Sequence, residues 1–214
     1  MGIQHLGAFG GFRNKTGALV GHRTGGQNVI TAIPHPSNKP PSVAQLNQRA
    51  KFGMLVSFLR RMTSLIRVGF QDAREQKQSA FSAAIAENYY KAITGVAPNF
   101  SIDYTKLVYS KGLLSMPYNP TAVIDTPATV KVSWLAYFEA DSGSATDMAT
   151  IVVYNPTKGQ FVKLTGAAAR SALTFNLPVP ADFAGDDCHV WISMVSANGK
   201  LVSDSQYIGE FTIL

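Results

Sequence analysis

The chain has 214 residues, of which 46% are hydrophobic and 15% charged, and its net charge is +6. This length suits one large domain or two small ones with a real hydrophobic core, and the composition excludes a mostly disordered protein. The charge is uneven: residues 1–78 carry 11 Lys or Arg against two acidic residues, a net +9, and residues 79–214 carry a net −3. A basic front suits head-to-tail association of like chains, an acidic partner such as nucleic acid, or simply a solvated basic face.

Cysteine content and apolar runs limit the setting of the protein. The single cysteine, Cys188, excludes an intrachain disulfide and gives no basis for a cysteine-based metal site, so we expect a buried structural thiol. The first residues lack the charged head and apolar run of a secretory signal. The longest apolar stretch, 52–59, is too short to span a bilayer. We expect a protein made in the cytoplasm, without a membrane span, whose final location is open among an intracellular complex, a virion and an exported filament.

Residues 1–41 form a glycine- and proline-rich arm and linker. The arm holds eight of the chain's 18 glycines, and strand-forming pieces lie between them at 8–9, 18–20 and 28–33. The stretch 34–41 is too rich in proline for a helix or an inner strand. Such an arm buries little apolar surface for the backbone entropy that it loses on ordering. We therefore expect it to lack a partner within the chain and to order by pairing with another domain or another copy.

Residues 42–97 read as a helical segment. Ser42 and Gln45 have the spacing of a capping box, so a helix should begin there. The apolar residues that follow cover more than one side of this helix, which is typical of a helix covered on more than one side. The stretch 69–78 looks like a polar break, and a second helix is expected over 79–93, with Gly95 as its left-handed cap.

Residues 100–214 read as an all-β domain. Apolar and polar residues alternate along several short runs, and Asn198-Gly199 is the strongest short signal for a hairpin. The strand candidates are 103–110, 128–138, 148–154, 160–164, 171–177, 188–196 and 200–213. Several short strands with turn residues between them favour a β-sandwich. The predicted fold class is therefore α+β: a β arm and a helical segment, followed by the sandwich.

The β domain resembles a fibronectin type III or immunoglobulin-like sandwich. The resemblance rests on residues 130–134 (VKVSW), as in an early strand with a core tryptophan, and on residues 189–200 (HVWISMVSANGK), as in a late hairpin. It implies a fold and no function.

The chain as a whole resembles a family of uncharacterised bacterial proteins, defined by a domain of unknown function. The matching pieces span nearly the whole sequence: Gly10-Gly11-Phe12 with Gly17 and Val20-Gly21, residues 39–52 (KPPSVAQLNQRAKF), residues 153–156 (VYNP), residues 166–171 (GAAARS) and residues 203–207 (SDSQY). The resemblance implies no activity and no catalytic residues.

No residue pattern indicates catalysis, a cofactor or a metal. The four histidines, His5, His22, His35 and His189, lack the spacing of metal ligands. The acidic pairs Asp186-Asp187 and Asp141/Asp147 lie in turn-like contexts, where Asp more often stabilises the turn itself. The glycine-rich arm lacks the Gly-Lys-Ser/Thr of a phosphate loop. We therefore predict a non-enzymatic protein with no cofactor.

The main functional hypothesis is homo-oligomeric assembly by strand addition from the arm, into a filament, sheath or virion-like structure. Its predicted anchors are Phe9, Phe12, Leu19, Val20, Val29 and Ile30. An arm that folds back on its own chain is the simpler alternative.

The alternative function is nucleic-acid binding through the basic half of the chain. The residues concerned are Arg49, Lys51, Arg60, Arg61 and Arg67, interleaved with Phe52, Phe58 and Phe70. The same cations would also suit contacts with the acidic sandwich of a neighbouring copy.

Overall fold

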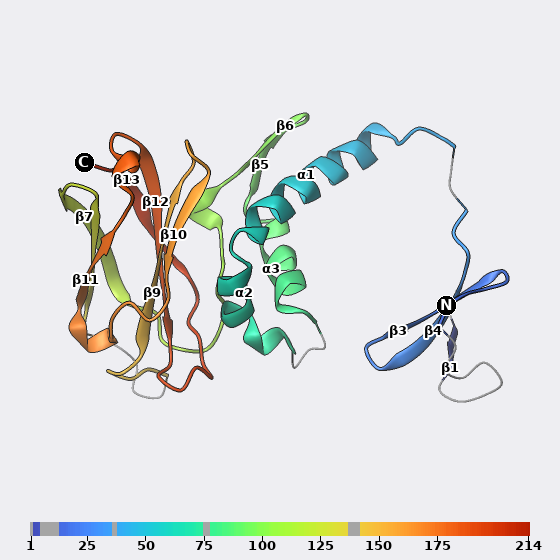
Figure 1. The fold of residues 1–214 in the computed structure, drawn as a ribbon, viewed down its shortest axis with the longest axis horizontal. Coiled ribbons are helices and arrows are strands. Elements are labelled where there is room, and N and C mark those ends of the chain that lie inside the picture. The colour runs from blue at the N-terminus through green and yellow to red at the C-terminus, as the bar shows by residue number, and fades with distance from the viewer. Residues whose placement is uncertain (1, 5–12, 36–37, 75–77, 137–141) are drawn as a thin grey trace. The chain divides into compact units, whose positions relative to one another are not determined.

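The computed structural model divides the chain into two compact units, Met1–Gln45 and Leu46–Leu214 (Figure 1). It describes residues 2–4, 13–35, 38–74, 78–136 and 142–214. The sequence alone suggested boundaries near residues 41 and 97–100. The structure instead has one boundary between units, because the helices and the sandwich share a hydrophobic core.

The amino-terminal unit is a four-stranded antiparallel sheet. Its strands are β1 (Gly2–Gln4), β2 (Asn14–Thr16), β3 (Leu19–Thr24) and β4 (Gln27–Ala32), in the order β1-β4-β3-β2. Strands at 18–20 and 28–33 were expected, but the expectation that they lack a partner within the chain is wrong. They pair with each other from Leu19↔Ala32 to Thr24↔Gln27, because Gly25 and Gly26 supply the positive φ angles of a tight turn. The strand expected at 8–9 lies outside the described residues.

Three helices follow: α1 (Val43–Arg60), α2 (Thr63–Gly69) and α3 (Ala80–Tyr89). The predicted capping box is present, since the amide N–H of Gln45 donates to Ser42 Oγ and that of Ser42 to Gln45 Oε1. The helix that was expected over 79–93 is α3, and it ends earlier, at Tyr89. Residues 93–96 are rich in β-branched side chains and form strand β5 (Ile93–Val96), paired with β6 (Asn99–Ile102). Gly95, at φ +90°, therefore belongs to a hairpin and not to a helix cap.

The carboxy-terminal region is a sandwich of two antiparallel sheets, which confirms the predicted α+β fold class. One sheet has the order β11-β8-β7, built from β7 (Tyr118–Thr126), β8 (Thr129–Leu135) and β11 (Thr174–Pro178). The other has the order β10-β9-β12-β13, built from β9 (Met148–Asn155), β10 (Gln160–Leu164), β12 (Asp187–Val195) and β13 (Gln206–Thr212). Alternate residues of the two sheets, including Val132, Trp134, Ile151 and Ile192, meet in the core between them.

Two strand predictions in this region are wrong. The segment 103–110 contains a short 3-10 helix, Tyr104–Lys106, because Asp103 accepts a hydrogen bond from the amide of Thr105 and caps a helical turn. Strand β7 was missed because Asn119, at φ +45°, and Pro120 interrupt its apolar pattern.

The helices form a third layer on one side of the sandwich (Figure 1). Leu59, Met62 and Ile66 pack against Val152 and Trp191 on the outer face of β9 and β12. The sheet of β10, β9, β12 and β13 is thus covered on both faces, and β9 and β12 are buried along almost their whole length. This double burial explains why both strands read as nearly continuous apolar runs.

The close approach of α2 to the backbone of Tyr109 and Ser110 predicts that Gly69→Ala destabilises the protein. A Cβ at Gly69 would lie 2.4 Å from the carbonyl oxygen of Tyr109 and 2.7 Å from Ser110 Cα. These are backbone atoms, so the substitution must move α2 and should lower the free energy of unfolding by about 1–3 kcal/mol. Denaturant unfolding measures the loss. Gly53→Ala is the control, because no atom lies within 4 Å of its Cβ position and alanine should stabilise α1. Equal stability of the two variants would contradict the prediction.

Candidate functional site: the amino-terminal sheet

The amino-terminal sheet carries apolar side chains on both of its faces. Directly paired residues of an antiparallel sheet lie on the same face, and successive residues of one strand alternate. The pairs Leu19↔Ala32 and Gly21↔Ile30 therefore place Leu19 and Ile30 on one face. The pairs Val20↔Thr31 and His22↔Val29 place Val20 and Val29 on the other. Each face thus carries two of the predicted anchors, which the sequence could not separate without the register.

Little of this apolar surface is buried within the unit. Among the residues of the unit whose side chains the structure describes, Val29 is the only buried hydrophobic one, at 7% exposure. Leu19 is 39% exposed, and Val20 and Ile30 are partly exposed. The described strands of the unit all belong to one sheet. A sheet with apolar residues on a face is normally covered there by another layer.

The edges of the sheet are short. Strands β1 and β2 have three residues each, and the described residues place no further strand beside either of them. Short edge strands limit uncontrolled pairing with other chains. Strand addition at these edges would therefore supply few main-chain hydrogen bonds. Phe9 and Phe12, the other two predicted anchors, lie outside the described residues.

The five basic residues that were singled out do not form one patch. Arg49 and Arg60 are 11 residues apart in α1, about three whole turns, so they share a face, and Lys51 lies on the opposite side. Lys51 Nζ lies 4.8 Å from the centre of the Phe100 ring, and Arg61 Nη1 donates to the carbonyl oxygen of Gly159 at 2.6 Å. Within the described part of the chain, no carboxylate forms an ion pair with any of the five basic residues.

Two of the three phenylalanines that are interleaved with these cations in the sequence are not exposed beside them in the structure. Phe58 and Phe70 are buried in the core between the helices and the sandwich. Only Phe52 is half-exposed. Phe58 and Phe70 lie where the helices pack on the sheet, whereas Arg60, Arg61 and Arg67 are exposed. Two of the three rings are thus unavailable for stacking on bases.

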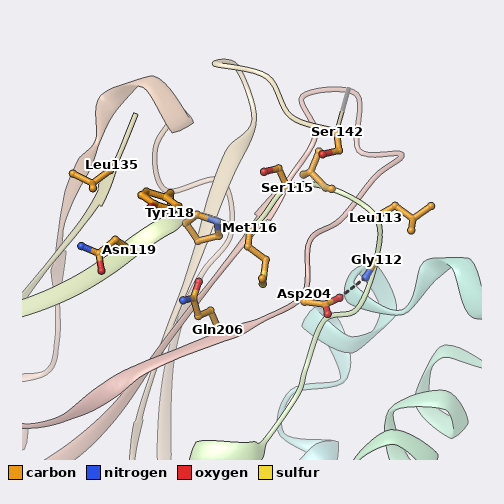
Figure 2. A pocket seen from close by; sticks show the side chains of 12 residues that line it. Gly112, Leu113, Ser115, Met116, Tyr118, Asn119, Leu135, Ser142, Asp204 and Gln206 are labelled. Atoms are coloured by element: carbon orange, nitrogen blue, oxygen red, sulfur yellow. Dashed lines mark hydrogen bonds between the residues drawn. The ribbon is translucent and has the colours of Figure 1, made fainter. Parts of the chain in front are cut away.

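A groove of about 760 Å³ lies at one end of the sandwich (Figure 2). The chain segment 112–119 lines it, together with Leu135, Ser142, Asp204 and Gln206. The carboxylate of Asp204 is engaged, because it accepts a hydrogen bond from the amide of Gly112 at 2.9 Å. The described lining residues include no histidine, lysine or cysteine. The groove therefore offers apolar contact and hydrogen bonds, and no sequence motif marked it.

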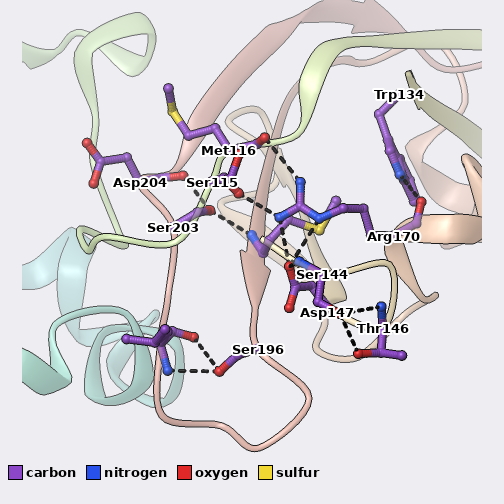
Figure 3. Close-up of polar contacts among 12 residues, drawn as sticks. Ser115, Met116, Trp134, Ser144, Thr146, Asp147, Arg170, Ser196, Ser203 and Asp204 are labelled. Carbon is purple, nitrogen blue, oxygen red and sulfur yellow. Dashed lines mark hydrogen bonds and ion pairs between the residues drawn. The ribbon is translucent and has the colours of Figure 1, made fainter. Parts of the chain in front are cut away.

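A buried ion pair holds three loops together near this groove (Figure 3). Arg170 and Asp147 are 1% and 2% exposed, and Arg170 Nη2 lies 3.1 Å from Asp147 Oδ2. The guanidinium also donates to the carbonyl oxygens of Ser115, at 2.6 Å, and Met116, at 3.2 Å. Asp147 lies in a turn, since it accepts from the amide of Ser144 at 2.8 Å. Its ion pair with Arg170 was not foreseen, because the two residues are 23 positions apart in the sequence.

The remaining reactive side chains serve packing. Cys188 is buried, which confirms the structural thiol, and burial raises its pKa to about 11. Burial lowers the pKa of His189, whose Nδ1 lies 2.9 Å from the hydroxyl of Tyr207. No group of three metal-ligating side chains comes together among the described residues. Across the same residues, no helix has the length and apolarity required to cross a membrane.

The strand order defines the class of the carboxy-terminal region. Three strands, β7, β8 and β11, face the four strands β10, β9, β12 and β13, which makes a fibronectin type III-like β-sandwich, and the helices add a layer to it. Residues 11–209 match a family described as "Family of unknown function (DUF6266)". The chain belongs to this family, which confirms the resemblance seen in the sequence.

Solved structures similar to this chain contain fibronectin type III domains. One is the solution structure of the fn3 domain of the human collagen alpha-1(XX) chain, with 20% identity, 47% of this chain and 85% of that chain covered, and a TM-score of 0.33. Another is the twitchin kinase region from C. elegans, with 16% identity and a TM-score of 0.32. That match covers 45% of this chain and only 16% of the twitchin chain. No curated protein matches the chain.

Proposed function

We propose that this chain is a non-enzymatic structural protein whose copies associate through the amino-terminal sheet. The observation that carries the proposal is the apolar surface on both faces of a single sheet whose unit buries only Val29 among its described hydrophobic side chains. Such faces gain free energy when another layer covers them.

A second copy is a suitable cover. The sheets of two copies are identical, so Leu19 and Ile30 of one can pack against Leu19 and Ile30 of the other across a two-fold axis. The segment between the sheet and α1 includes Pro34, Pro40 and Pro41, and proline-rich linkers behave as semi-rigid spacers. Such a spacer favours contact of the sheet with another molecule over folding back.

The expected free energy of association through one face of the sheet is small. Fully burying one Leu, Ile or Val side chain contributes about 1.5–3 kcal/mol, and these side chains are already partly buried. Association costs about 4–15 kcal/mol in lost freedom. One face alone should therefore bind weakly and in a concentration-dependent way. Covering both faces requires each copy to contact two others, and this repetition gives an open array such as a filament or sheath.

Deleting residues 2–33 should convert the oligomer into a monomer. Light scattering over a range of concentrations measures the mass, and thermal unfolding verifies that the unit Leu46–Leu214 remains folded. The paired substitution Leu19→Lys with Ile30→Lys should weaken association through one face. Thr24→Lys is the matched control, because it adds a charge to an exposed polar position of the same sheet.

Two results would refute the proposal. One is a full-length protein that is monomeric at high concentration, which would indicate a sheet covered by its own chain. The other is an oligomer whose mass is unchanged by the deletion.

Nucleic-acid binding stays a prediction. The cations on which it depends lack carboxylate partners among the described residues, but within α1 Lys51 lies on the side opposite to Arg49 and Arg60. Phe58 and Phe70 are buried. No observation favours it over self-association.

A further inference from the structure

A cavity of about 440 Å³ lies between α2 and the sandwich. Leu65, Val68 and Gly69 of α2 line one side. Thr150 of β9 and Ser193 of β12 line the other, and these two residues are directly paired across the strands. Their side chains therefore lie on the same outer face of the sheet, about 5 Å apart at Cβ. The volume falls in the range of small-molecule binding pockets.

The sheet side of the cavity has unused hydrogen-bonding capacity. The buried Tyr109 hydroxyl lies 3.1 Å from Ser193 Oγ and 3.4 Å from the carbonyl oxygen of Thr150, so the Ser193 hydroxyl already has a hydrogen-bond partner. Thr150 Oγ1 is buried without any partner among the described residues. A buried hydroxyl without a partner costs about 1–3 kcal/mol, so the Thr150 hydroxyl is unusual in a plain structural core.

The walls decide the chemical class of a ligand. Leu65, Val68, Met148 and Val195 are apolar, and none of the residues that line the cavity is charged. A charged molecule would lose its hydration there without gaining a counter-ion. The unpartnered hydroxyl of Thr150 suits an oxygen that accepts its proton in a hydrogen bond. An uncharged carbonyl or amide oxygen on an apolar body satisfies both conditions.

The rim leaves a route for entry. Gly166, Ala197 and Gly199 line the outer part of the cavity and are exposed, while Thr150 and Ser193 are buried. Small side chains at the rim and polar groups at the buried end would orient a ligand with its oxygen inward.

We propose that this cavity binds a small uncharged molecule whose carbonyl or amide oxygen accepts a hydrogen bond from Thr150. The site lies in the unit Leu46–Leu214 and does not depend on association through the amino-terminal sheet. Binding contacts both α2 and the sheet, so it stabilises the attachment of the helical layer to the sandwich.

The test compares three probes of similar size on the full-length protein: benzamide, toluene and benzoate. The methyl resonance of Met148, a lining residue, reports binding by NMR titration. Benzamide should shift this resonance with a Kd on the order of 1 mM, as suits a ligand with few atoms. Toluene lacks the oxygen and should bind about three- to tenfold more weakly. Benzoate should bind at least about tenfold more weakly, because its charge is not compensated.

Variants separate a binding site from a packing defect. Thr150→Val keeps the shape of the side chain and removes its hydroxyl. It should therefore weaken the binding of benzamide about three- to tenfold and leave the binding of toluene unchanged. It should also raise the melting temperature of the free protein, because it removes a buried hydroxyl without a partner. Val68→Phe should fill the cavity and abolish the shift for both probes. Val123→Phe on β7, an exposed position that does not line the cavity, is the control and should change neither.

Three outcomes would overturn the proposal. The first is the absence of a Met148 shift with every probe at its solubility limit. The second is equal binding of benzamide and benzoate. The third is a Thr150→Val variant that binds benzamide as the native protein does, since the hydroxyl would then have no part in recognition.

Discussion

Arg170→Ala is expected to lower the free energy of unfolding by about 3–5 kcal/mol. The substitution leaves the carboxylate of Asp147 buried at 2% exposure without its counter-ion. It also removes the donors that satisfy the carbonyl oxygens of Ser115 and Met116. A buried charge without a partner is among the most costly defects in a protein interior. Chemical denaturation of the purified variant measures the loss as a lower denaturant midpoint.

Two further variants provide reference values for the loss of stability in Arg170→Ala. Arg170→Lys keeps the charge but lacks the planar fork that contacts Asp147 and two carbonyl groups at once, so its stability should be intermediate. Lys158→Ala removes the partner of Asp186 in an ion pair at the surface, where solvent screens the attraction, and should cost much less than Arg170→Ala. If Arg170→Ala were no worse than Lys158→Ala, the three loops would not depend on the buried pair.

Asn88→Ala is expected to lower the free energy of unfolding by about 3 kcal/mol, since the lost bonds leave two partly buried backbone groups unsatisfied. Asn88 is fully buried in α3, and its side-chain amide forms hydrogen bonds with both backbone groups of Val108. Its Nδ2 donates to the carbonyl oxygen of Val108 at 2.7 Å, and its Oδ1 accepts from the amide of Val108 at 2.8 Å. Alanine leaves the amide and the carbonyl of Val108 without partners. Denaturant unfolding measures the total, and hydrogen exchange of the Val108 amide should accelerate.

Ser82→Ala provides the matched control for Asn88. It removes a polar side chain from an exposed position of the same helix and should change stability by less than about 0.5 kcal/mol. Unchanged exchange at Val108 in the Asn88 variant would show that another group holds the segment after α3.

Local patterns account for the elements that could be predicted. The capping box at Ser42 and Gln45 starts α1, and Asn198-Gly199 turns the chain between β12 and β13, with Gly199 at φ +71°. These signals act over four residues or fewer, so a single sequence contains them completely. Strand β7 shows the limit, because Asn119 and Pro120 mask an alternation that pairing with β8 stabilises anyway.

The candidate site was predicted only in part, for the same reason. The sequence placed Leu19, Val20, Val29 and Ile30 in strands and marked them as apolar. It could not show that two lie on each face, because a face depends on which residues pair. The basic residues were recognised one by one, but the burial of Phe58 and Phe70 depends on a sheet formed about 90 residues later.

The sequence by itself determined the α+β class, the capped start of α1, most strands of the sandwich and the family, since periodicity, caps and turn residues are local properties. Only the tertiary structure decided the pairing of the amino-terminal strands, the third layer of helices and the cavity floored by Thr150 and Ser193. It also decided the burial of Arg170 and Asn88, two polar residues that composition alone would place at the surface. Each of these features depends on partners 20 or more positions away, or on strand register, and a polar group becomes tolerable in the interior only when such partners surround it.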